Sequence, residues 1–406
     1  MSTDRRLYPS TLHPPDLSAD DDAGAEENLP WFLLELKAYV AKRDNATTAF
    51  SRTWDALMPA EIHVEPRILA AEDDLAVLAI TVGPQKDVDK NLDCYVYQVD
   101  DDGSGRPSLT HIPRPPRPYF FGANDTGVLR YRTDDEHTAG RREYIVAALY
   151  RAPWGLPAGQ FDLCLSDSKR GYWKLSKRRR HGGRNFYHKN CKVVAIGGDA
   201  GTMAFVDLWW GIIFCDVLRV EGPLLRYVAV PEPMQNNKTL DDDARLYRDI
   251  AVVGDRLKYV ELQLHWKACA HFSKSYFSDG WMASDTEIMD STDVKVHGKL
   301  VPKVWRDQGM ALSPFRDLDA CQPVLGLQED ADIVYFTTKL NRWDADAWVV
   351  AVDMRKRELL GVDAFAAQRY VGINFYVHAR ISKHLMNPET ARDVMLSRFA
   401  NNKQVY

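Results

Sequence analysis

The sequence lacks the features that would direct the chain into or across a membrane. Residues Met1 to Arg6 lead into acidic, proline-containing sequence without the apolar stretch of a secretory signal peptide. No run approaches the ~18 apolar residues that a membrane-spanning helix needs. We therefore expect no membrane partner and a location in the cytoplasm or the nucleus.

Cysteine is scarce and scattered. The absence of any C-x-x-C pair argues against a regular zinc-binding or disulfide framework. Several cysteines lie in strand-like apolar runs, where a free thiol behaves as a small hydrophobe, so we expect buried, reduced thiols. One cluster, His265, Cys269 and His271, offers at most three of the four ligands of a structural zinc site, and we expect no metal. The six cysteines are Cys94, Cys164, Cys191, Cys215, Cys269 and Cys321.

Signatures of catalysis and of nucleotide binding are also missing. The sequence contains no G-x-S-x-G, H-E-x-x-H, Walker or G-x-G-x-x-G motif. Gly197 to Gly201 has the composition of a phosphate-binding loop, but strand-like runs flank it and no helix pattern follows, which favours a hairpin turn. We expect no catalytic residue and no cofactor, and the sequence argues more against an enzyme than for one.

The composition is that of an ordinary globular protein. The 406 residues are 45% hydrophobic and 27% charged, and 52 basic against 57 acidic side chains give a formal charge of −5. This balance gives no overall electrostatic reason to expect a nucleic-acid partner. Residues 1–28 differ from the rest, because their prolines, the acidic run Asp20 to Asp22 and the low apolar content predict a disordered acidic tail.

Strand-like apolar runs, each ended by turn residues, recur along residues 29–380. They fall into five groups of four that repeat about every 40 to 60 residues, as the blades of a propeller do. We predict an all-β, propeller-like domain of about five four-stranded blades, or six if the termini contribute a whole blade. The runs are 68–70, 75–82, 94–99 and 109–112; 128–131, 144–150, 161–165 and 172–175; 193–196, 205–210, 212–218 and 225–230; 250–253, 257–264, 281–288 and 301–305; 324–327, 333–337, 348–352 and 359–362.

Both ends of this domain carry further elements. Trp31 to Tyr39 has the pattern of a strand, and we expect it to pair with a strand around Ile373 to Val377 and so close the ring without an exposed edge. Residues 381–406 are expected to form a tail with a short helix, because Asn387 precedes Pro388 as an N-cap precedes the first helical turn.

The most distinctive segment spans residues 205–231. It reads Phe-Val-Asp-Leu-Trp-Trp-Gly-Ile-Ile-Phe-Cys-Asp-Val-Leu, followed by Leu-Leu-Arg-Tyr-Val-Ala-Val-Pro. This pattern predicts consecutive antiparallel strands, with Trp209 and Trp210 on opposite faces of one strand because side chains alternate across a sheet. Asp207 and Asp216 flank the two tryptophans. They could form an acid/base pair in a channel, but an aspartate at a strand end more often caps a turn.

The same segment resembles the signature of the plant family known as domain of unknown function 1618, which is greatly expanded in grasses. The N-terminal stretch supports this resemblance, since residues 30–34, 38–39 and 45–49 are similar to the family's W-V-L-L-D, A-Y and N-A-T-T-A motifs. Glu35 departs from the aspartate of the first motif. The resemblance spans most of residues 30–370 and implies no particular activity, because the family has none established.

The densest positive patch lies between the second and third predicted blades. Clustered cations of this kind contact nucleic-acid phosphates or serve as nuclear-import signals. The adjacent glycine pair and the small number of nearby aromatics favour a solvated loop over an import signal, and an import signal over nucleic-acid binding. The patch consists of Lys177, Arg178, Arg179 and Arg180.

A proline-rich segment satisfies the P-x-x-P pattern twice, with arginines between the prolines. The pattern predicts a polyproline II segment, which either docks in an aromatic groove of a partner or serves as a stiff linker between the first and second blades. We favour the linker. Its prolines are Pro113, Pro115, Pro116 and Pro118.

Together these observations predict a monomeric, non-enzymatic scaffold that binds an unknown protein partner, since rigid propellers expose loops on which binding residues collect. Two alternatives stay open. A hydrolase or lyase would use carboxylates in a central channel, and a substrate-recognition module for ubiquitin ligation would bind its targets without an F-box of its own.

Overall fold

The structure of the protein is a computed structural model. The predicted acidic tail of residues 1–28 and the predicted C-terminal helix near Asn387 lie outside the residues that it describes. The described residues are 32–38, 66–81, 92–99, 107–116, 118–119, 122–131, 143–151, 159–171, 173–179, 187–219, 225–240, 242–268, 276–284, 288–290, 295, 318–329, 332–340, 346–365 and 376–381.

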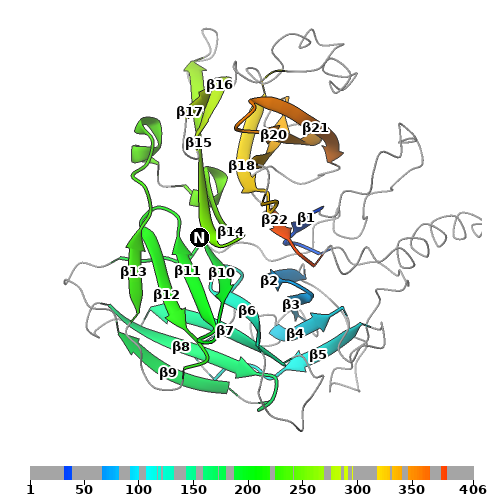
Figure 1. Cartoon of the computed structure of the whole chain (residues 1–406), viewed down its shortest axis with the longest axis vertical. Helices are drawn as coiled ribbons and strands as arrows, with labels where there is room; N and C mark the ends of the chain where they lie inside the picture. Colours follow the sequence, from blue (N-terminus) through cyan, green and yellow to red (C-terminus); the bar gives the residue numbers. More distant parts are fainter. Residues whose placement is uncertain are drawn as a thin grey trace, which may run out of the picture. The chain divides into compact units, whose positions relative to one another are not determined.

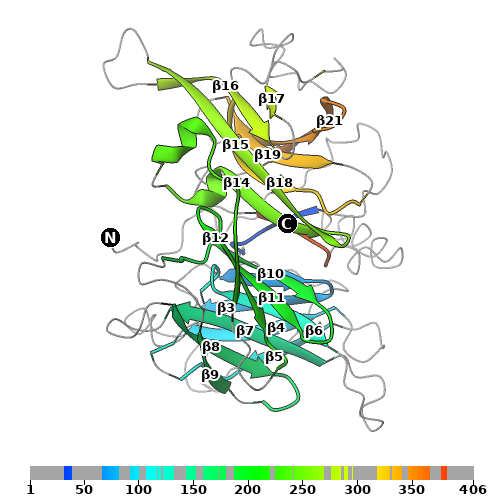
Figure 2. The ribbon, with the colours of Figure 1, turned by 60° about the vertical axis from the view of Figure 1, so that its left-hand side comes forward.

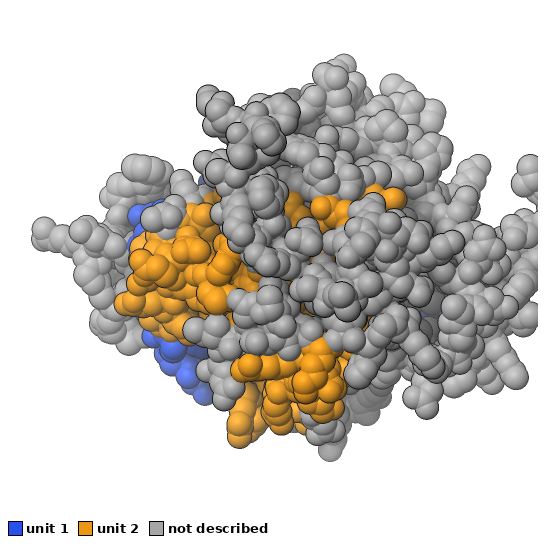
Figure 3. Space-filling model, turned by 90° about the horizontal axis from the view of Figure 1, so that it is seen from above, with its two compact units in different colours: residues 1–207, 212–228, 379–406 blue, residues 208–211, 229–378 orange. Residues whose placement is uncertain are grey.

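The chain divides into two compact units, coloured separately in Figure 3. Unit 1 comprises residues 1–207, 212–228 and 379–406, and unit 2 comprises Leu208–Gly211 and Ala229–His378. Each unit is built from four-stranded antiparallel sheets whose strand order follows the chain, and each sheet is called a blade below. The described part of the chain holds no helix long and apolar enough to cross a membrane.

Blades 1 to 3 belong to unit 1 and lie in the lower half of Figure 1. Blade 1 consists of β2 (Arg67–Glu72), β3 (Leu75–Thr81), β4 (Leu92–Gln98) and β5 (Ser108–Ile112). Blade 2 consists of β6 (Thr126–Tyr131), β7 (Glu143–Arg151), β8 (Gln160–Asp167) and β9 (Trp173–Arg179). Blade 3 consists of β10 (Lys192–Gly197), β11 (Thr202–Asp207), β12 (Gly211–Asp216) and β13 (Arg226–Ala229).

Blades 4 and 5 belong to unit 2. Blade 4 consists of β14 (Arg248–Val253), β15 (Arg256–Ala268), β16 (Tyr276–Ser284) and β17 (Ile288–Asp290). Blade 5 consists of β18 (Asp319–Leu325), β19 (Ile333–Lys339), β20 (Ala347–Asp353) and β21 (Glu358–Phe365). Two 3₁₀ helices, η4 (Gln235–Thr239) and η5 (Ala244–Leu246), precede blade 4.

The packing within unit 1 follows from the alternation of side chains along a strand. β7 is apolar along almost its whole length because blade 2 lies between two cores, so both of its faces are buried. One set of its residues packs with blade 1 and the other with blade 3. The sets are Tyr144, Val146 and Ala148, and Ile145, Ala147 and Leu149.

Unit 2 has one core between its two blades. Trp281 of β16 and Phe336 of β19 are buried there with their ring centroids 4.8 Å apart, close enough for a favourable aromatic contact. Val260 and Leu262 of β15 complete the blade 4 side of this core. Each blade thus buries a face against its neighbour in the same unit, as propeller blades do.

The first strands of neighbouring blades lie next to one another. β6 packs beside both β2 and β10 in unit 1, and β14 packs beside β18 in unit 2 (Figure 2). Five four-stranded antiparallel blades with this order confirm the predicted all-β, propeller-type fold.

The fourth strand of blade 4 differs from its prediction. It is β17, which follows β16 after three residues and pairs with it from Ser284 and Ile288 onward. The prediction of one continuous run over residues 281–288 is therefore wrong, because the chain reverses inside it. The run 301–305, predicted as the fourth strand, lies outside the described residues.

The terminal strands pair as predicted. β1 (Phe32–Glu35) and β22 (Tyr376–Ala379) form a two-stranded antiparallel or parallel pairing of their own, separate from the five blades. Each of the five blades is complete without these strands, so neither terminus supplies a missing blade strand. The residues after β1 lie beside the first strand of blade 1, where the Ile68 amide donates to the Leu36 carbonyl at 2.8 Å.

Candidate functional site

The tryptophan pair lies in a turn between β11 and β12. β11 ends at Asp207 and β12 begins at Gly211, so Trp209 and Trp210 do not belong to a strand. The prediction that they occupy opposite faces of one strand is wrong, because residues 208–210 are the ones that reverse the chain. Trp209 is half-buried against the core of unit 2, whereas Trp210 is 60% exposed.

This turn, residues 208–210, is fixed by a hydrogen bond at each of its residues and is called the Trp turn below. The Arg248 guanidinium donates to the Leu208 carbonyl at 2.8 Å. The Trp209 indole N–H donates to the Asp242 carbonyl at 3.2 Å. The Val230 amide donates to the Trp210 carbonyl at 3.4 Å. The backbone that carries the exposed Trp210 ring is therefore held in one position.

Arg248 is the central cation of unit 2. Its side chain is buried and pairs with the buried carboxylate of Glu261, Nη2 to Oε2, at 2.9 Å. The guanidinium also lies 4.9 Å from the ring centroid of Trp209 and 5.5 Å from that of Tyr259, within the range of cation–π attraction. A buried guanidinium needs such partners, because its charge has been removed from water.

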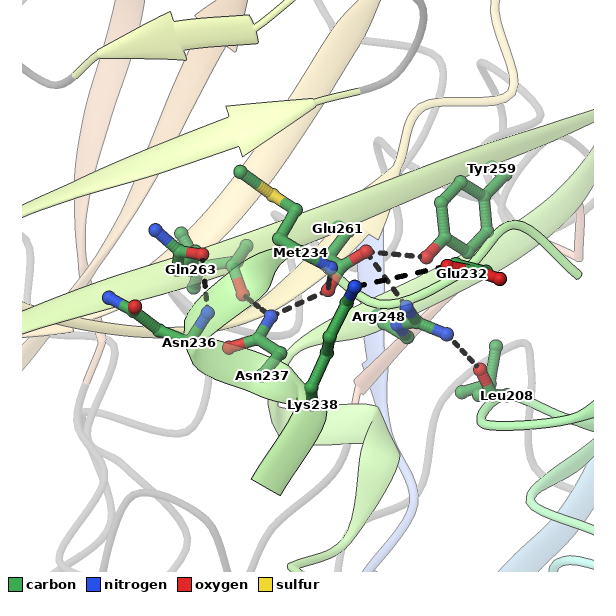
Figure 4. A network of polar contacts seen from close by, with 11 residues as sticks. Leu208, Glu232, Met234, Asn236, Asn237, Lys238, Arg248, Tyr259, Glu261 and Gln263 are labelled. Atoms are coloured by element: carbon green, nitrogen blue, oxygen red, sulfur yellow. Dashed lines mark hydrogen bonds and ion pairs between the residues drawn. The ribbon is translucent and has the colours of Figure 1, made fainter. Parts of the chain in front are cut away.

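Glu261 uses both carboxylate oxygens as acceptors (Figure 4). Oε1 accepts from the Met234 amide at 2.9 Å and from the Asn237 side-chain amide at 2.7 Å. Oε2 accepts from Arg248 and, at 2.9 Å, from the Tyr259 hydroxyl, whose pKa burial raises well above its usual range. Four donors occupy this carboxylate, so it acts as a structural anchor and not as a proton carrier.

The network fastens η4 to β15. Asn237 of η4 is buried, and its amide also donates to the Leu262 carbonyl at 2.9 Å. The Asn236 amide donates to the Gln263 side chain at 3.0 Å. The outer side of the same loop is exposed at Gln235 and Lys238. We call Trp210 with Pro231 and Glu232, the exposed residues that follow its backbone partner Val230, the Trp210 surface.

Asp207 and Asp216 lie at opposite ends of their hairpin. β11 ends at Asp207, whereas Asp216 ends β12 beside Thr202, whose hydroxyl it accepts at 2.7 Å. About five residues of strand at ~3.3 Å each separate the two carboxylates, too far for a shared proton. Asp207 instead accepts from the Lys189 amide at 2.7 Å. The two aspartates therefore do not form an acid/base pair.

Aspartates close the third strand of three blades in the same way. Asp167 accepts from the Lys169 amide at 3.0 Å, and Asp353 accepts from the Lys356 amide at 2.9 Å. Asp216 ends the corresponding strand of blade 3. The predicted turn-capping role is confirmed for Asp167 and Asp353.

Gly197 to Gly201 is a hairpin turn between β10 and β11, as predicted. Gly198 and Gly201 adopt positive φ angles of 74° and 59°, and the Gly201 amide donates to the Gly198 carbonyl at 2.9 Å. A strand follows the turn where a phosphate-binding loop would be followed by a helix.

Three of the four basic residues of the predicted loop belong to the outer strand of blade 2. β9 ends at Arg179, so the loop assignment is wrong for Lys177, Arg178 and Arg179, while Arg180 lies outside the described residues. Arg178 faces Phe161 across the ladder, is buried and donates to the Arg219 carbonyl at 3.1 Å. Lys177 is exposed on this strand.

The proline-rich segment connects β5 to β6, which confirms its predicted position as a linker between blades 1 and 2. Pro113, Pro116 and Pro118 are exposed and Pro115 is half-buried. The Trp173 indole of β9 donates to the Pro113 carbonyl, and the Tyr119 hydroxyl donates to Asp162, which lies directly opposite Lys177. The prolines and the basic strand, far apart in sequence, therefore lie on one face of blade 2.

The proposed metal ligands are not brought together among the described residues. His265 contacts Gln263 at 3.2 Å, whereas Cys269 and His271 lie outside the described ranges. The described part of the chain holds no group of three or more histidine, cysteine or acidic side chains suited to a metal ion. Burial raises the thiol pKa of Cys94, Cys164 and Cys215 to about 12, so these cysteines are unreactive core residues.

Comparison with solved structures finds two distant similarities. Hydrazine synthase of Kuenenia stuttgartiensis is 11% identical, with 73% of this chain and 67% of that chain covered and a TM-score of 0.29. The β-propeller domain of the trilobed protease of Pyrococcus furiosus is 9% identical, with 76% and 85% covered and a TM-score of 0.27. These values carry no argument about function, and the fold assignment depends on the five blades themselves.

No curated protein shows significant similarity to the sequence. A family match covers the segment that holds the Trp turn, η4, β14 and β15, the elements that make up the network around Glu261. Residues 205–335 match the family described as protein of unknown function (DUF1618), which confirms the family resemblance that the tryptophan segment predicts.

Proposed function

We propose that the protein is a non-enzymatic interaction scaffold that docks a protein partner through the Trp210 surface. The observation that carries this proposal is the combination of a 60% exposed tryptophan with a backbone held at Leu208, Trp209 and Trp210. Tryptophan is enriched among the residues that dominate binding energy in protein interfaces. A fixed turn presents it without a large loss of conformational entropy on binding.

The buried network gives the same surface its rigidity. Arg248 connects the Trp turn to Glu261, and Glu261 holds the loop that begins near Pro231 through Met234 and Asn237. The exposed side chains of this loop are thus supported from beneath by buried polar contacts. Binding residues on rigid supports are what an interaction scaffold requires.

The described carboxylates support a scaffold better than a hydrolase or lyase. Glu261 accepts four hydrogen bonds, Asp207 accepts from a backbone amide and Asp216 accepts from Thr202. Groups that are fully engaged in structural contacts are poorly placed to transfer protons to a substrate. Substrate recognition for ubiquitin ligation would be a special case of the same docking, and the identity of the partner distinguishes it. We propose that the scaffold acts as a monomer in the cytoplasm or nucleus.

The experiment compares partners recovered by the full-length chain and by two single variants. Trp210→Ala removes the exposed ring, and Leu360→Ala removes an exposed apolar side chain of blade 5 that is 41% accessible. We expect at least one protein to be retained by the wild type and by Leu360→Ala but lost with Trp210→Ala. Identical sets of partners for all three chains, with unchanged melting temperatures, would contradict the proposal.

A further inference from the structure

The outer strand of blade 2 offers a second surface that is independent of the Trp210 surface and belongs to unit 1. β9 is the last strand in the order β6-β7-β8-β9, so one of its edges faces away from the sheet (Figure 1). Backbone N–H and C=O groups at such an edge can pair with an added strand. Only an added strand of matching side chains would be stabilised there.

The side chains of β9 are cationic and lack nearby compensation. Within the described part of the chain, neither Lys174 nor Lys177 makes an ion pair. Lys174 lies opposite the apolar Leu165, and Lys177 lies opposite Asp162. The Asp162 carboxylate is occupied by the Tyr119 hydroxyl at 2.7 Å. Two positive charges on this edge are therefore available to an acidic ligand.

The spacing of these residues defines the ligand. Lys174 and Lys177 are three positions apart, so they project to opposite faces of the sheet. Leu175 lies between them, shares a face with Lys177 and is 45% exposed. In an antiparallel strand added to this edge, the residues opposite positions 177 to 174 would read acidic, any, apolar, acidic, because directly opposed side chains interact most strongly.

We propose that β9 binds an extended acidic segment of a partner protein as a fifth strand of blade 2. Backbone hydrogen bonds supply the attachment, carboxylates opposite Lys174 and Lys177 supply the charge selection, and an apolar side chain covers Leu175. The exposed prolines Pro113 and Pro116 lie on the same face of blade 2 as Leu175 and Lys177, where they border the added strand.

Two other roles for the basic strand predict different behaviour. Lysines on an edge strand also discourage unwanted sheet pairing, but they do so against neutral and basic strands and favour acidic ones. Nucleic-acid binding would use the cations against phosphates. It is less well supported, because Arg178 is buried and engaged with the Arg219 carbonyl and the chain carries a formal charge of −5.

The test measures binding of a fluorescein-labelled ten-residue peptide, Ser-Gly-Thr-Glu-Thr-Val-Glu-Thr-Gly-Ser, to the full-length chain by anisotropy. We expect saturable binding that weakens about fivefold or more when both glutamates are replaced by glutamine. A peptide with N-methyl groups on alternate residues of its pairing edge should not bind, because it cannot form the ladder. Equal binding of the acidic, glutamine and N-methylated peptides would overturn the proposal.

Variants of the chain locate the site. Lys177→Glu should abolish peptide binding and Lys174→Gln should weaken it, whereas Lys177→Arg should retain it. Lys189→Glu makes the same charge change at an exposed residue of unit 1 outside β9 and should bind as the wild type does. Equal loss with Lys189→Glu would show a general charge effect and overturn the site. Tighter binding of a ten-nucleotide single-stranded DNA that is lost with Lys177→Glu would also overturn the proposal, in favour of a nucleic-acid ligand.

Discussion

Arg248 and Glu261 face each other directly across the β14–β15 hairpin, and their charged groups meet at 2.9 Å with both side chains buried. A buried ion pair adds little net stability, because desolvation of the two charges offsets their attraction. Its value here is positional. The pair connects the Leu208 carbonyl of the Trp turn to the Met234 amide of the η4 loop, so both exposed segments share one buried support.

Removing one partner of this pair should destabilise the protein more than removing both. Glu261→Leu leaves the Arg248 charge buried without its counterion and should lower the free energy of unfolding by about 3–5 kcal/mol. The double variant Arg248→Met/Glu261→Leu removes the stranded charge and should recover part of this loss. Urea unfolding followed by tryptophan fluorescence measures both, and a double variant less stable than Glu261→Leu would contradict the assignment.

The two tryptophans should differ in their effect on stability. Trp209 packs on the unit 2 core and over Arg248, so Trp209→Ala should cost about 2 kcal/mol, below the ~3–5 kcal/mol of a fully buried aromatic. Trp210→Ala removes an exposed ring and should change stability by no more than about 0.5 kcal/mol. Thermal melts compare the two, and equal losses would show that Trp210 serves the fold and not a surface.

The hairpin between β10 and β11 provides a matched pair of glycine variants. Gly198 and Gly201 both have positive φ, but a Cβ at Gly198 would meet open space, whereas one at Gly201 would lie 2.5 Å from Cγ of Leu218. Gly198→Ala should cost about 1 kcal/mol from backbone strain alone. Gly201→Ala should cost about 2–3 kcal/mol, because overpacking adds to the strain. Equal unfolding midpoints for the two variants would refute the described turn.

Glu72 should make the stability of unit 1 depend on pH. Burial raises the pKa of its carboxyl group from the ordinary value of 4.5 to about 7, against the opposing effect of Arg380 at 3.9 Å. The folded chain therefore keeps a proton that the unfolded chain has lost between about pH 4.5 and 7. Stability should fall as the pH rises through this window.

The variant Glu72→Gln cannot lose this proton and should have a flatter stability profile between pH 4.5 and 7. Glu329→Gln, in unit 2, makes the same chemical change at a carboxylate away from this site and serves as the control. Urea midpoints measured at pH 5 and pH 7 provide the comparison. A wild-type profile that rises across the window would show that Glu72 is ionised throughout.

Much of the fold could be predicted because its information is local. The strands of the five blades are short apolar runs ended by glycine, proline or aspartate, and these signals depend on neighbouring residues alone. The Trp turn could not be read this way, because residues 208–210 are as apolar as the strands beside them. Its reversal depends on contacts with Arg248, Asp242 and Val230, which come from later segments of the chain.

The buried network had one signal in the sequence that was open to interpretation. Gly254 and Asp255 form a two-residue turn, and counting outward from it pairs Arg248 with Glu261 across the hairpin. Opposite charges at directly paired positions predict an ion pair, although not its burial. The meeting of the prolines with β9 had no such signal, because the contact of Trp173 with Pro113 joins residues sixty positions apart.

The central claim is that the Trp210 surface binds a protein partner. The most direct measurement is hydrogen–deuterium exchange of the full-length chain with and without the partner recovered by the wild type and lost with Trp210→Ala. The account predicts slower exchange on binding in Leu208–Gly211 and in residues 229–240, with the remaining blades unchanged. Unaltered exchange in these two segments, together with protection elsewhere in the chain, would contradict it.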